Sequence, residues 1–188
     1  VSLSSDGTIL AIGANKNDGG VTLSDRGHVR VYQYSSGSWT QLGNDIDGDE
    51  AGNQSGRSVS LSSDGSIVAI GEYLHDEERG KVSIHQYTSG SWIQLGSDIL
   101  GENISDRFGL SVSLSNDGTR VIIGANRNDG DSGDPDDNRG HAQVYEYSSG
   151  SWNLLFNIDG ESAFDYSGTS VSISGNGNQF AIGATKND

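Results

Sequence analysis

The sequence predicts an all-β fold made of repeated four-stranded antiparallel sheets, the blades of a β-propeller. The first observation is a repeat: similar strings of residues begin at Val1, Val59, Val112 and Val171, so the spacing is between 53 and 59 residues. The second is that apolar and polar residues alternate within each repeat, as they do in half-buried strands. The third is that no stretch has the period or the caps of a helix. A repeat of this length is typical of propellers and other arrays of one structural unit.

Each repeat begins with two strand signals joined by a short turn. In the second repeat, residues 59–61 alternate and the Asp64-Gly65 pair follows, which predicts a tight hairpin turn with positive φ at both positions. Residues 67–71 are almost continuously apolar, so they predict a strand that is buried on both faces. We therefore expect Val59, Leu61, Val68 and Ile70 in the core.

Two more strands complete each unit. In the first repeat, residues 29–34 alternate again, and a turn of Ser and Gly leads to residues 39–42. The chain thus contains three complete repeats and the first two strands of a fourth, as one propeller segment over residues 1–188. An equivalent Trp stands in every complete repeat, at Trp39, Trp92 and Trp152, and we interpret it as a packing residue rather than a sugar-stacking one.

Composition excludes several classes of protein. There is no Cys, so disulfides, thiolate metal sites and cysteine nucleophiles are excluded. The 26 acidic and 11 basic residues give a net charge of -15, which argues against a nucleic-acid partner and for cations or basic surfaces. No apolar run is long enough to insert into a membrane. Because the chain begins at Val1 rather than Met, we expect it to be a piece of a longer protein.

The variable part of each repeat is the connection between its second and third strands. These connections and the links between repeats should emerge on the same face, which we name the long-loop face. It comprises residues 14–28, 72–81, 125–141 and 184–188 together with the links 43–58, 96–111 and 156–170. Most of the acidic residues lie there. The face is therefore either a solvated surface that keeps the protein soluble or a surface for divalent cations or basic partners.

The sequence from Phe108-Gly109-Leu110 to Ile123-Gly124 resembles the FG-GAP repeat of integrin alpha-chain propellers and of other surface proteins. The resemblance implies a seven-bladed propeller, of which this chain is less than half, with extracellular roles in adhesion, ligand display or surface assembly. In that family calcium is held in a loop between the first two strands. Here that connection is a bare Asp-Gly or Asn-Gly pair, so no calcium ligands are transferred to it.

One loop of the long-loop face is rich in the oxygen donors that calcium prefers. Its candidate metal ligands are Asn126, Asn128, Asp129, Asp131 and Asp134. Their spacing fits no known cation-loop template, because the EF-hand pattern would place Arg127 at a ligand position. A solvated loop is therefore the favoured interpretation, and calcium is the one cofactor that the sequence suggests.

Two other sets of residues on the long-loop face have a repeated or recognisable pattern. An Asp follows each leading Val by 17 residues and an Arg precedes each third strand, which predicts ion pairs at the bases of the loops. These candidate pairs are Asp18 with Arg26, Asp76 with Arg79, and Asp129 with Arg139. Asn53 and Asn103 begin the sequences Asn-Gln-Ser and Asn-Ile-Ser, so both are candidate glycosylation sites if the protein passes through a eukaryotic secretory route.

No set of residues predicts catalysis, because the four His do not recur as a group and no nucleophile elbow or paired carboxylate stands out. We expect a non-catalytic extracellular structural or adhesive module. Its expected partners are the rest of the parent chain, or neighbouring copies in a filament, and a protein or glycan ligand. The alternative is a carbohydrate-binding propeller that uses exposed aromatic residues of the long-loop face: Tyr73, Phe108, Phe164 and Tyr166.

Overall fold

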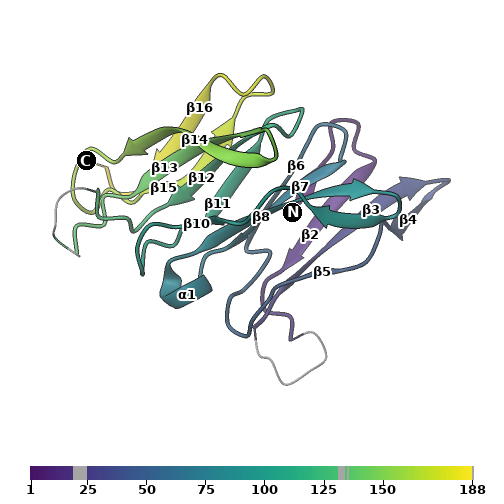
Figure 1. The fold of residues 1–188 in the computed structure, drawn as a ribbon, viewed down its shortest axis with the longest axis horizontal. Helices are drawn as coiled ribbons and strands as arrows, with labels where there is room; N and C mark the ends of the chain where they lie inside the picture. Colours follow the sequence, from purple (N-terminus) through teal and green to yellow (C-terminus); the bar gives the residue numbers. More distant parts are fainter. Residues whose placement is uncertain (19–24, 131–133, 135, 188) are drawn as a thin grey trace.

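The computed structural model describes residues 1–18, 25–130, 134 and 136–187. These residues form four antiparallel sheets that follow one another along the chain (Figure 1). The predicted all-β fold class is confirmed. The only helix in the described residues, α1 (His75–Glu78), is a single turn. No helix among them is long and apolar enough to cross a membrane.

Each sheet contains strands that are consecutive in the chain. The first consists of β1 (Ser2–Leu3), β2 (Ile9–Ala14), β3 (His28–Ser35), β4 (Ser38–Gln41) and β5 (Ile46–Asp47). The second consists of β6 (Ser58–Leu61), β7 (Ile67–Glu72), β8 (Lys81–Thr88), β9 (Ser91–Gln94) and β10 (Ile99–Leu100). The third consists of β11 (Ser111–Leu114), β12 (Arg120–Ala125), β13 (His141–Ser148) and β14 (Ser151–Asp159), and the fourth of β15 (Ser167–Ile173) and β16 (Phe180–Ala184).

The first turn of each repeat differs from the predicted one. Only the Gly has positive φ, between 68° and 72° in the four repeats, whereas the preceding Asp or Asn does not. In the second repeat the Asp64 carboxylate accepts hydrogen bonds from the Ser66 backbone N–H at 3.0 Å and from the Ser62 hydroxyl at 2.7 Å. The side chain thus stabilises a longer turn that ends in a left-handed Gly, and the prediction of positive φ at both residues is wrong.

The hydrophobic core lies between consecutive sheets. On β7, Val68 and Ile70 pack against the first sheet, whereas Ile67 and Ala69 pack against the third. All six residues of this strand are buried, which confirms the prediction of a strand covered on both faces. Burial of each Val or Ile side chain contributes about 1.5–3 kcal/mol, so the contacts between sheets are the main stabilising term.

Leu61, Val68 and Ile70 are buried as predicted, but Val59 is only half-buried. Val59 lies on β6, which is hydrogen-bonded to β7 on one side only. Because β6 is an edge strand, its side chains have neighbours in the sheet on one side only. Val59 therefore stays half-buried, and the prediction that it is buried is wrong.

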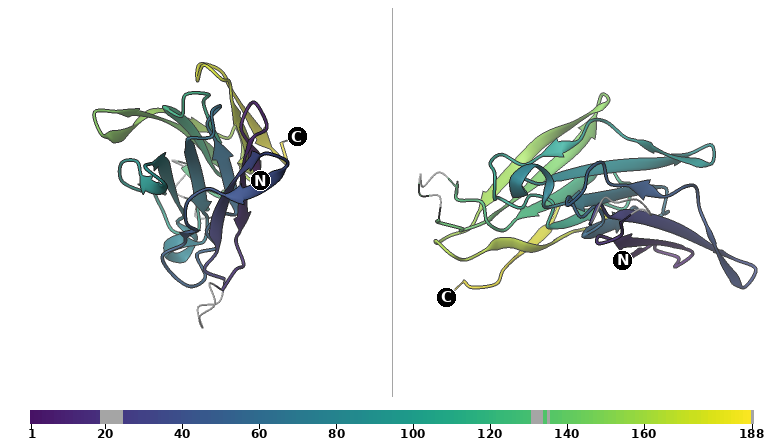
Figure 2. Two further views of the ribbon diagram at one scale, coloured as in Figure 1. Left: turned by 90° about the vertical axis from the view of Figure 1, so that its right-hand side faces the viewer. Right: turned by 90° about the horizontal axis from the view of Figure 1, so that it is seen from below.

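The first strands of the four sheets lie next to one another. β6 contacts β1 and β11, and β11 in turn contacts β15. The sheets therefore stack face to face, and Figure 2 shows these layers from two further sides. The first strands of consecutive sheets are adjacent in this stack.

The fourth strand extends further than predicted in every complete repeat. In the first two repeats it is interrupted at Gly43 and Gly96, whose φ values are 77° and 78°, and it resumes as β5 and β10. In the third repeat no Gly stands at this point, and β14 runs without interruption past an irregularity opposite Val144 and Tyr145. β5 and β10 lie in the stretches 43–58 and 96–111, which are predicted as links between repeats because two-residue strands have no period of their own.

Candidate functional site

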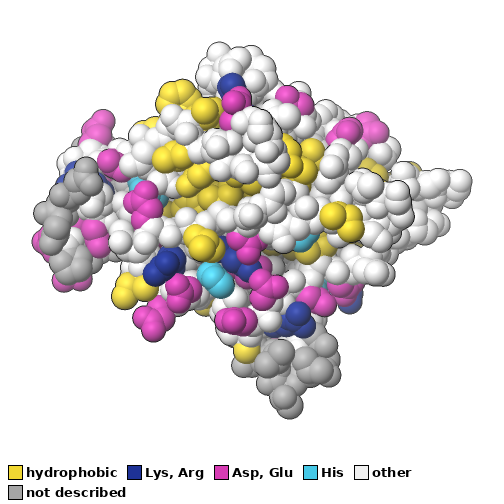
Figure 3. Space-filling view, in the orientation of Figure 1, with side chains coloured by type: hydrophobic (Ala, Val, Ile, Leu, Met, Phe, Trp, Pro, Cys, Tyr) yellow, Lys and Arg dark blue, Asp and Glu magenta, His cyan; other side chains and the backbone are white. Residues whose placement is uncertain are grey.

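Charged side chains of the long-loop face gather along the margin of the molecule around α1 (Figure 3). At their centre is Lys81, whose side chain is only 3% exposed. Its ammonium group binds Asp49 and lies 3.5 Å from a carboxylate oxygen of Glu72 and 3.5 Å from one of Asp98. The buried ammonium group thus connects three parts of the chain: the link before the second repeat, which carries Asp49, the end of β7, which carries Glu72, and the link after it, which carries Asp98.

The pKa values of this group reflect its burial. Burial raises the pKa of Glu72 above its ordinary value, and the nearby Lys81 only partly opposes the shift. Burial alone would lower the pKa of Lys81, but the hydrogen bond to Asp49 and the charge of Glu72 outweigh it, so this pKa is raised. Desolvation therefore offsets part of the attraction, so the cluster adds less stability than its three contacts alone would suggest.

A second contact recurs where a link meets the loop of the next repeat. Asp106 accepts hydrogen bonds from the side-chain amide of Asn128 at 2.8 Å and from the backbone N–H of Asn103 at 3.0 Å. Asp165 accepts the equivalent bonds from Asn187 at 3.0 Å and from the backbone of Ser162 at 2.9 Å. Burial raises the pKa of Asp106, although these hydrogen bonds oppose the shift.

In the link between the first two repeats, Asn53 takes the place of this aspartate. Its side-chain nitrogen lies 3.1 Å from Nδ1 of His75 and 3.5 Å from a carboxylate oxygen of Glu72. Asn53 is only 4% exposed, so a glycan could be attached to it only if the link were displaced. Asn103, the other candidate glycosylation site, has an exposed side chain.

The candidate calcium ligands make separate contacts in the loop. Asn128 accepts a hydrogen bond from the backbone of Gly130 at 2.8 Å, Asp129 from Asn138 at 2.9 Å and Asp134 from Asp136 at 3.1 Å. The amide nitrogen of Asn126 lies 3.4 Å from the Thr169 hydroxyl. Asp131 lies outside the described residues. Asn128 is thus engaged on both sides of its amide, by Asp106 and by Gly130.

The residues at the loop bases are arranged differently in each repeat. Arg79 pairs with Asp76 at 3.2 Å, whereas Arg139 pairs with Asp137 at 2.8 Å. Arg26 donates to the carbonyl oxygen of Gly48. Asp18 accepts a hydrogen bond from the backbone N–H of Asp25 at 2.8 Å, and Asp129 is bound in the same way by Asn138. In these two repeats the Asp therefore binds the residue that immediately precedes the Arg.

The four aromatic residues of the carbohydrate-binding alternative do not share one environment. Phe108 is fully buried and packs edge-on against Tyr145 at 6.4 Å between ring centroids, so its predicted exposure is wrong. Its strand-like position in the link directs it into the core between the second and third sheets. Tyr73 and Tyr166 are half-buried beneath cationic side chains, and Phe164 is 51% exposed.

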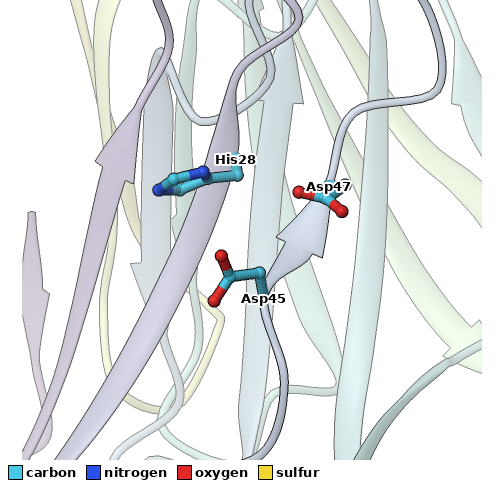
Figure 4. Close-up of side chains that lie close together, drawn as sticks. All are labelled: His28, Asp45 and Asp47. Carbon is cyan, nitrogen blue, oxygen red and sulfur yellow. The ribbon is translucent and has the colours of Figure 1, made fainter. Parts of the chain in front are cut away.

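One group of potential metal ligands is found among the described residues, and the sequence analysis missed it. His28, Asp45 and Asp47 bring one ligand atom each to within 4.8 Å of one another (Figure 4). His28 lies at the start of β3, and its partner across the sheet is Asp47 on β5. The signal that could have found it is the alternation of Asp45, Ile46 and Asp47, in which the apolar residue is buried and both acids lie on the other face.

Hydrogen bonds between first strands join the repeats to one another. The hydroxyl of Ser2 accepts a bond from the backbone N–H of Leu61 at 3.0 Å, and Ser60 accepts one from Leu114 at 3.0 Å. The bond from Ile173 to Ser113, at 3.2 Å, repeats the contact once more. The Ser residues that alternate with apolar ones in the first strands are therefore part of the contact between sheets.

Glycine residues allow consecutive repeats to approach closely. A Cβ added at Gly13 would overlap the carbonyl oxygen of Gly56, and the same is true of Gly71 with Gly109. Gly124 meets Gly168 in this way in the next repeat. The Gly at the end of each second strand is thus required by the backbone of the following repeat.

Comparisons with known proteins support the repeat architecture. Residues 102–145 match the family model described as the FG-GAP repeat, which confirms the resemblance for that segment. No curated protein matches the chain. Among solved structures with a similar fold is a candidate 6-phosphogluconolactonase from Bacteroides uniformis, with a TM-score of 0.53 and 16% identity over 86% of this chain. The chain spans 40% of that structure, and at this identity the likeness concerns the fold alone.

Proposed function

We propose that this chain, in which residues 102–145 match the FG-GAP repeat, is part of a non-catalytic structural or adhesive propeller of an extracellular or surface protein. Its end faces bind further repeats, either of a longer chain or of neighbouring copies. Its acidic long-loop face serves cation-assisted or protein contacts. The family match supports this class of function, since FG-GAP repeats are typical of surface proteins.

The observation that carries the proposal is the contrast between Leu3 and its equivalents. Leu61 and Leu114, at the same position of the next two repeats, are 7% exposed because the preceding sheet covers them, and Ile173 is 8% exposed. Leu3 is 57% exposed. The same side chain is thus buried wherever a preceding repeat is present, and an exposed apolar face of this kind favours association.

A structural role also accounts for the charged residues. Lys81 binds Asp49 and Glu72, and Asp106 and Asp165 hold the links in place. These contacts between elements give each of the groups a structural role. The loop residues Asn126, Asn128, Asp129, Asp131 and Asp134 stay the proposed place for calcium on the acidic face.

The test is the mass of the 188-residue chain in solution as a function of concentration, measured by light scattering. We expect the mass to increase with concentration through the end faces. Leu3→Lys should prevent this, whereas Ile93→Lys should not, because Ile93 is equally exposed, at 56%, but lies on the outer strand β9. A monodisperse monomer at all concentrations, or equal effects of both variants, would contradict the proposal.

The carbohydrate-binding alternative rests on Phe164, the one residue of the four proposed aromatics that is exposed, at 51%. A glycan array with the same chain distinguishes the two functions. Specific binding that is lost in Phe164→Ala would favour the lectin-like alternative, and no specific binding is expected from a structural module.

A further inference from the structure

The group formed by His28, Asp45 and Asp47 lies outside the contacts that hold the repeats together. His28 and Asp47 are direct cross-strand partners of β3 and β5, and Asp45 shares a face with Asp47 because it stands two residues earlier. One ligand atom from each lies within 4.8 Å of the others (Figure 4). Backbone pairing therefore fixes two of the three side chains next to each other.

His28 has no side-chain hydrogen bond to any described residue although it is only 5% exposed. Its ring nitrogens are not sealed from solvent, in contrast to those of His141, which are buried with no partner among the described residues. The group thus combines an imidazole that can still be reached by an ion and two carboxylates at its side, of which Asp45 is half-buried and Asp47 exposed.

The second repeat shows which kind of charge this place in the fold accepts. Lys81 begins β8 as His28 begins β3, and Asp98 precedes β10 as Asp45 precedes β5. There the buried ammonium group of Lys81 lies 3.5 Å from Asp98, with Asp49 and Glu72 on its other sides. In the second repeat the positive charge beside this carboxylate comes from the first residue of the third strand, whereas in the first repeat it comes from Arg30, and His28 stands at the place of Lys81.

We propose that His28, Asp45 and Asp47 bind a divalent transition-metal ion of the Zn²⁺ type. Imidazole nitrogen and carboxylate oxygen are suitable ligands for Zn²⁺, which binds them at about 2.0–2.2 Å and so holds tetrahedral ligand atoms about 3.4 Å apart. The three ligand atoms lie up to 4.8 Å apart, so the two Asp side chains must rotate toward His28 when an ion binds. A site with three protein ligands leaves the fourth position for water or for a ligand from another molecule.

Arg30 limits the affinity of this site. Its guanidinium group binds both carboxylate oxygens of Asp45 at 2.9–3.0 Å, and Gln41 donates to the same carboxylate at 2.6 Å. This pairing lowers the pKa of Asp45. A bound metal ion must share the carboxylate with Arg30, and the two positive charges repel each other.

The third repeat offers a matched control. His141 faces Asp159 across the sheet with 3.9 Å between the closest atoms, but Asn157 replaces the aspartate that corresponds to Asp45. A pair of ligands without the third carboxylate should bind Zn²⁺ far more weakly. The other two His are engaged, since His75 contacts Asn53 and His85 contacts Ser83 at 3.1 Å.

The experiment is calorimetric titration of the untagged 188-residue chain with Zn²⁺ at neutral pH, with Co²⁺ absorption as a second measurement of His and carboxylate ligation. We expect one site with a dissociation constant tighter than about 0.1 mM. Asp47→Asn and His28→Gln should each weaken binding at least about tenfold, Asp159→Asn should leave it unchanged, and Arg30→Gln should strengthen it severalfold.

Asp47 is exposed, so Asp47→Asn keeps the test valid even if His28→Gln alters folding, and thermal unfolding of each variant without metal verifies the fold. Absence of Zn²⁺ binding would overturn the proposal. Binding that is unaffected by Asp47→Asn, or that is lost in Asp159→Asn, would overturn it as well, because the ion would then lie elsewhere.

Discussion

The indole nitrogen of Trp92 donates a hydrogen bond to the carbonyl oxygen of Leu42 at 2.8 Å, and so connects the second sheet to the first. Trp152 makes the equivalent bond to Leu95 at 2.8 Å. Trp39 stands at the same position of the first repeat, but it is 44% exposed and its indole has no hydrogen-bond partner among the described residues. The Trp of each repeat is thus an inter-repeat contact that depends on the repeat before it.

Replacing Trp92 with Phe should lower the free energy of unfolding by about 1 kcal/mol more than replacing Trp39 with Phe, because only Trp92 loses a hydrogen bond. Both rings pack against a Tyr at 5.2–5.3 Å between centroids, and Trp92 also packs on the core between the first two sheets. Urea unfolding of the two variants measures the difference. Equal losses would show that the indole bond contributes nothing to stability.

Replacing Gly124 with Ala should destabilise the protein by about 1–3 kcal/mol, because the added Cβ would overlap the backbone carbonyl of Gly168 and force the sheets apart. Gly183 is the equivalent residue of the fourth repeat, and a Cβ there meets only the movable side chain of Ser170 at close range. Gly183→Ala should therefore cost much less in the same thermal or urea unfolding experiment. A similar loss in both variants would mean that the close approach of the backbones is not what requires Gly.

His141 should make stability dependent on pH near neutrality. Burial lowers its pKa, and neighbouring carboxylates, Glu102 foremost, oppose this shift only in part. Below about pH 6.5 the unfolded chain takes up a proton at this residue more readily than the folded chain, so stability decreases as the pH falls from 6.5 toward the lowered pKa.

The variant His141→Gln isolates this effect. Between pH 7 and pH 5 the wild-type protein should lose more unfolding free energy than the variant, because other titrating groups, including His85, are common to both. Parallel pH profiles from urea unfolding would contradict the assignment to His141.

Expression in a eukaryotic secretory host should lead to glycosylation at Asn103 and not at Asn53. The Asn103 side chain is exposed, whereas Asn53 is buried against Glu72 and His75. Mass spectrometry before and after glycosidase treatment gives the result, and Asn103→Gln should abolish the modification. A glycan on Asn53 would contradict this prediction, because it would show that the link is accessible to the glycosylation enzyme.

Much of the architecture could be predicted because it is encoded in short, local patterns. The alternation in residues 29–34 predicted β3, and the apolar run at 67–71 predicted β7. Because the sequence repeats, the same patterns predicted the equivalent strands of the other repeats. The prediction of the turn conformation was wrong because the Asp64 side chain accepts a hydrogen bond from the backbone of the turn. The alternation of residues in the flanking strands contains no information about such a bond. The strand β5 was missed because two residues are too few to show a period.

The candidate sites were harder to predict for a related reason. Asn128 was a candidate because its loop is rich in oxygen donors, and Asn53 because it begins a glycosylation sequence. In the structure Asn128 binds Asp106, and Asn53 contacts Glu72 and His75. Neither sequence pattern contains these partners. Asp45 and Asp47 carried no recognised motif, and they became metal-ligand candidates only when β5 paired with β3 and placed them beside His28.

By itself the sequence determined the all-β class, and it predicted the repeat boundaries and the face that carries the charged loops, because strand periodicity and loop length are properties of neighbouring residues. Only the tertiary structure decided that Val59 is half-buried and Phe108 fully buried, which acids are partners of Lys81, and that the His28 side chain makes no hydrogen bond to the described residues. Those outcomes depend on how one sheet packs against the next. Packing brings together residues about 20 to 60 positions apart in the sequence, and the alternation of neighbouring residues does not specify which of them will meet.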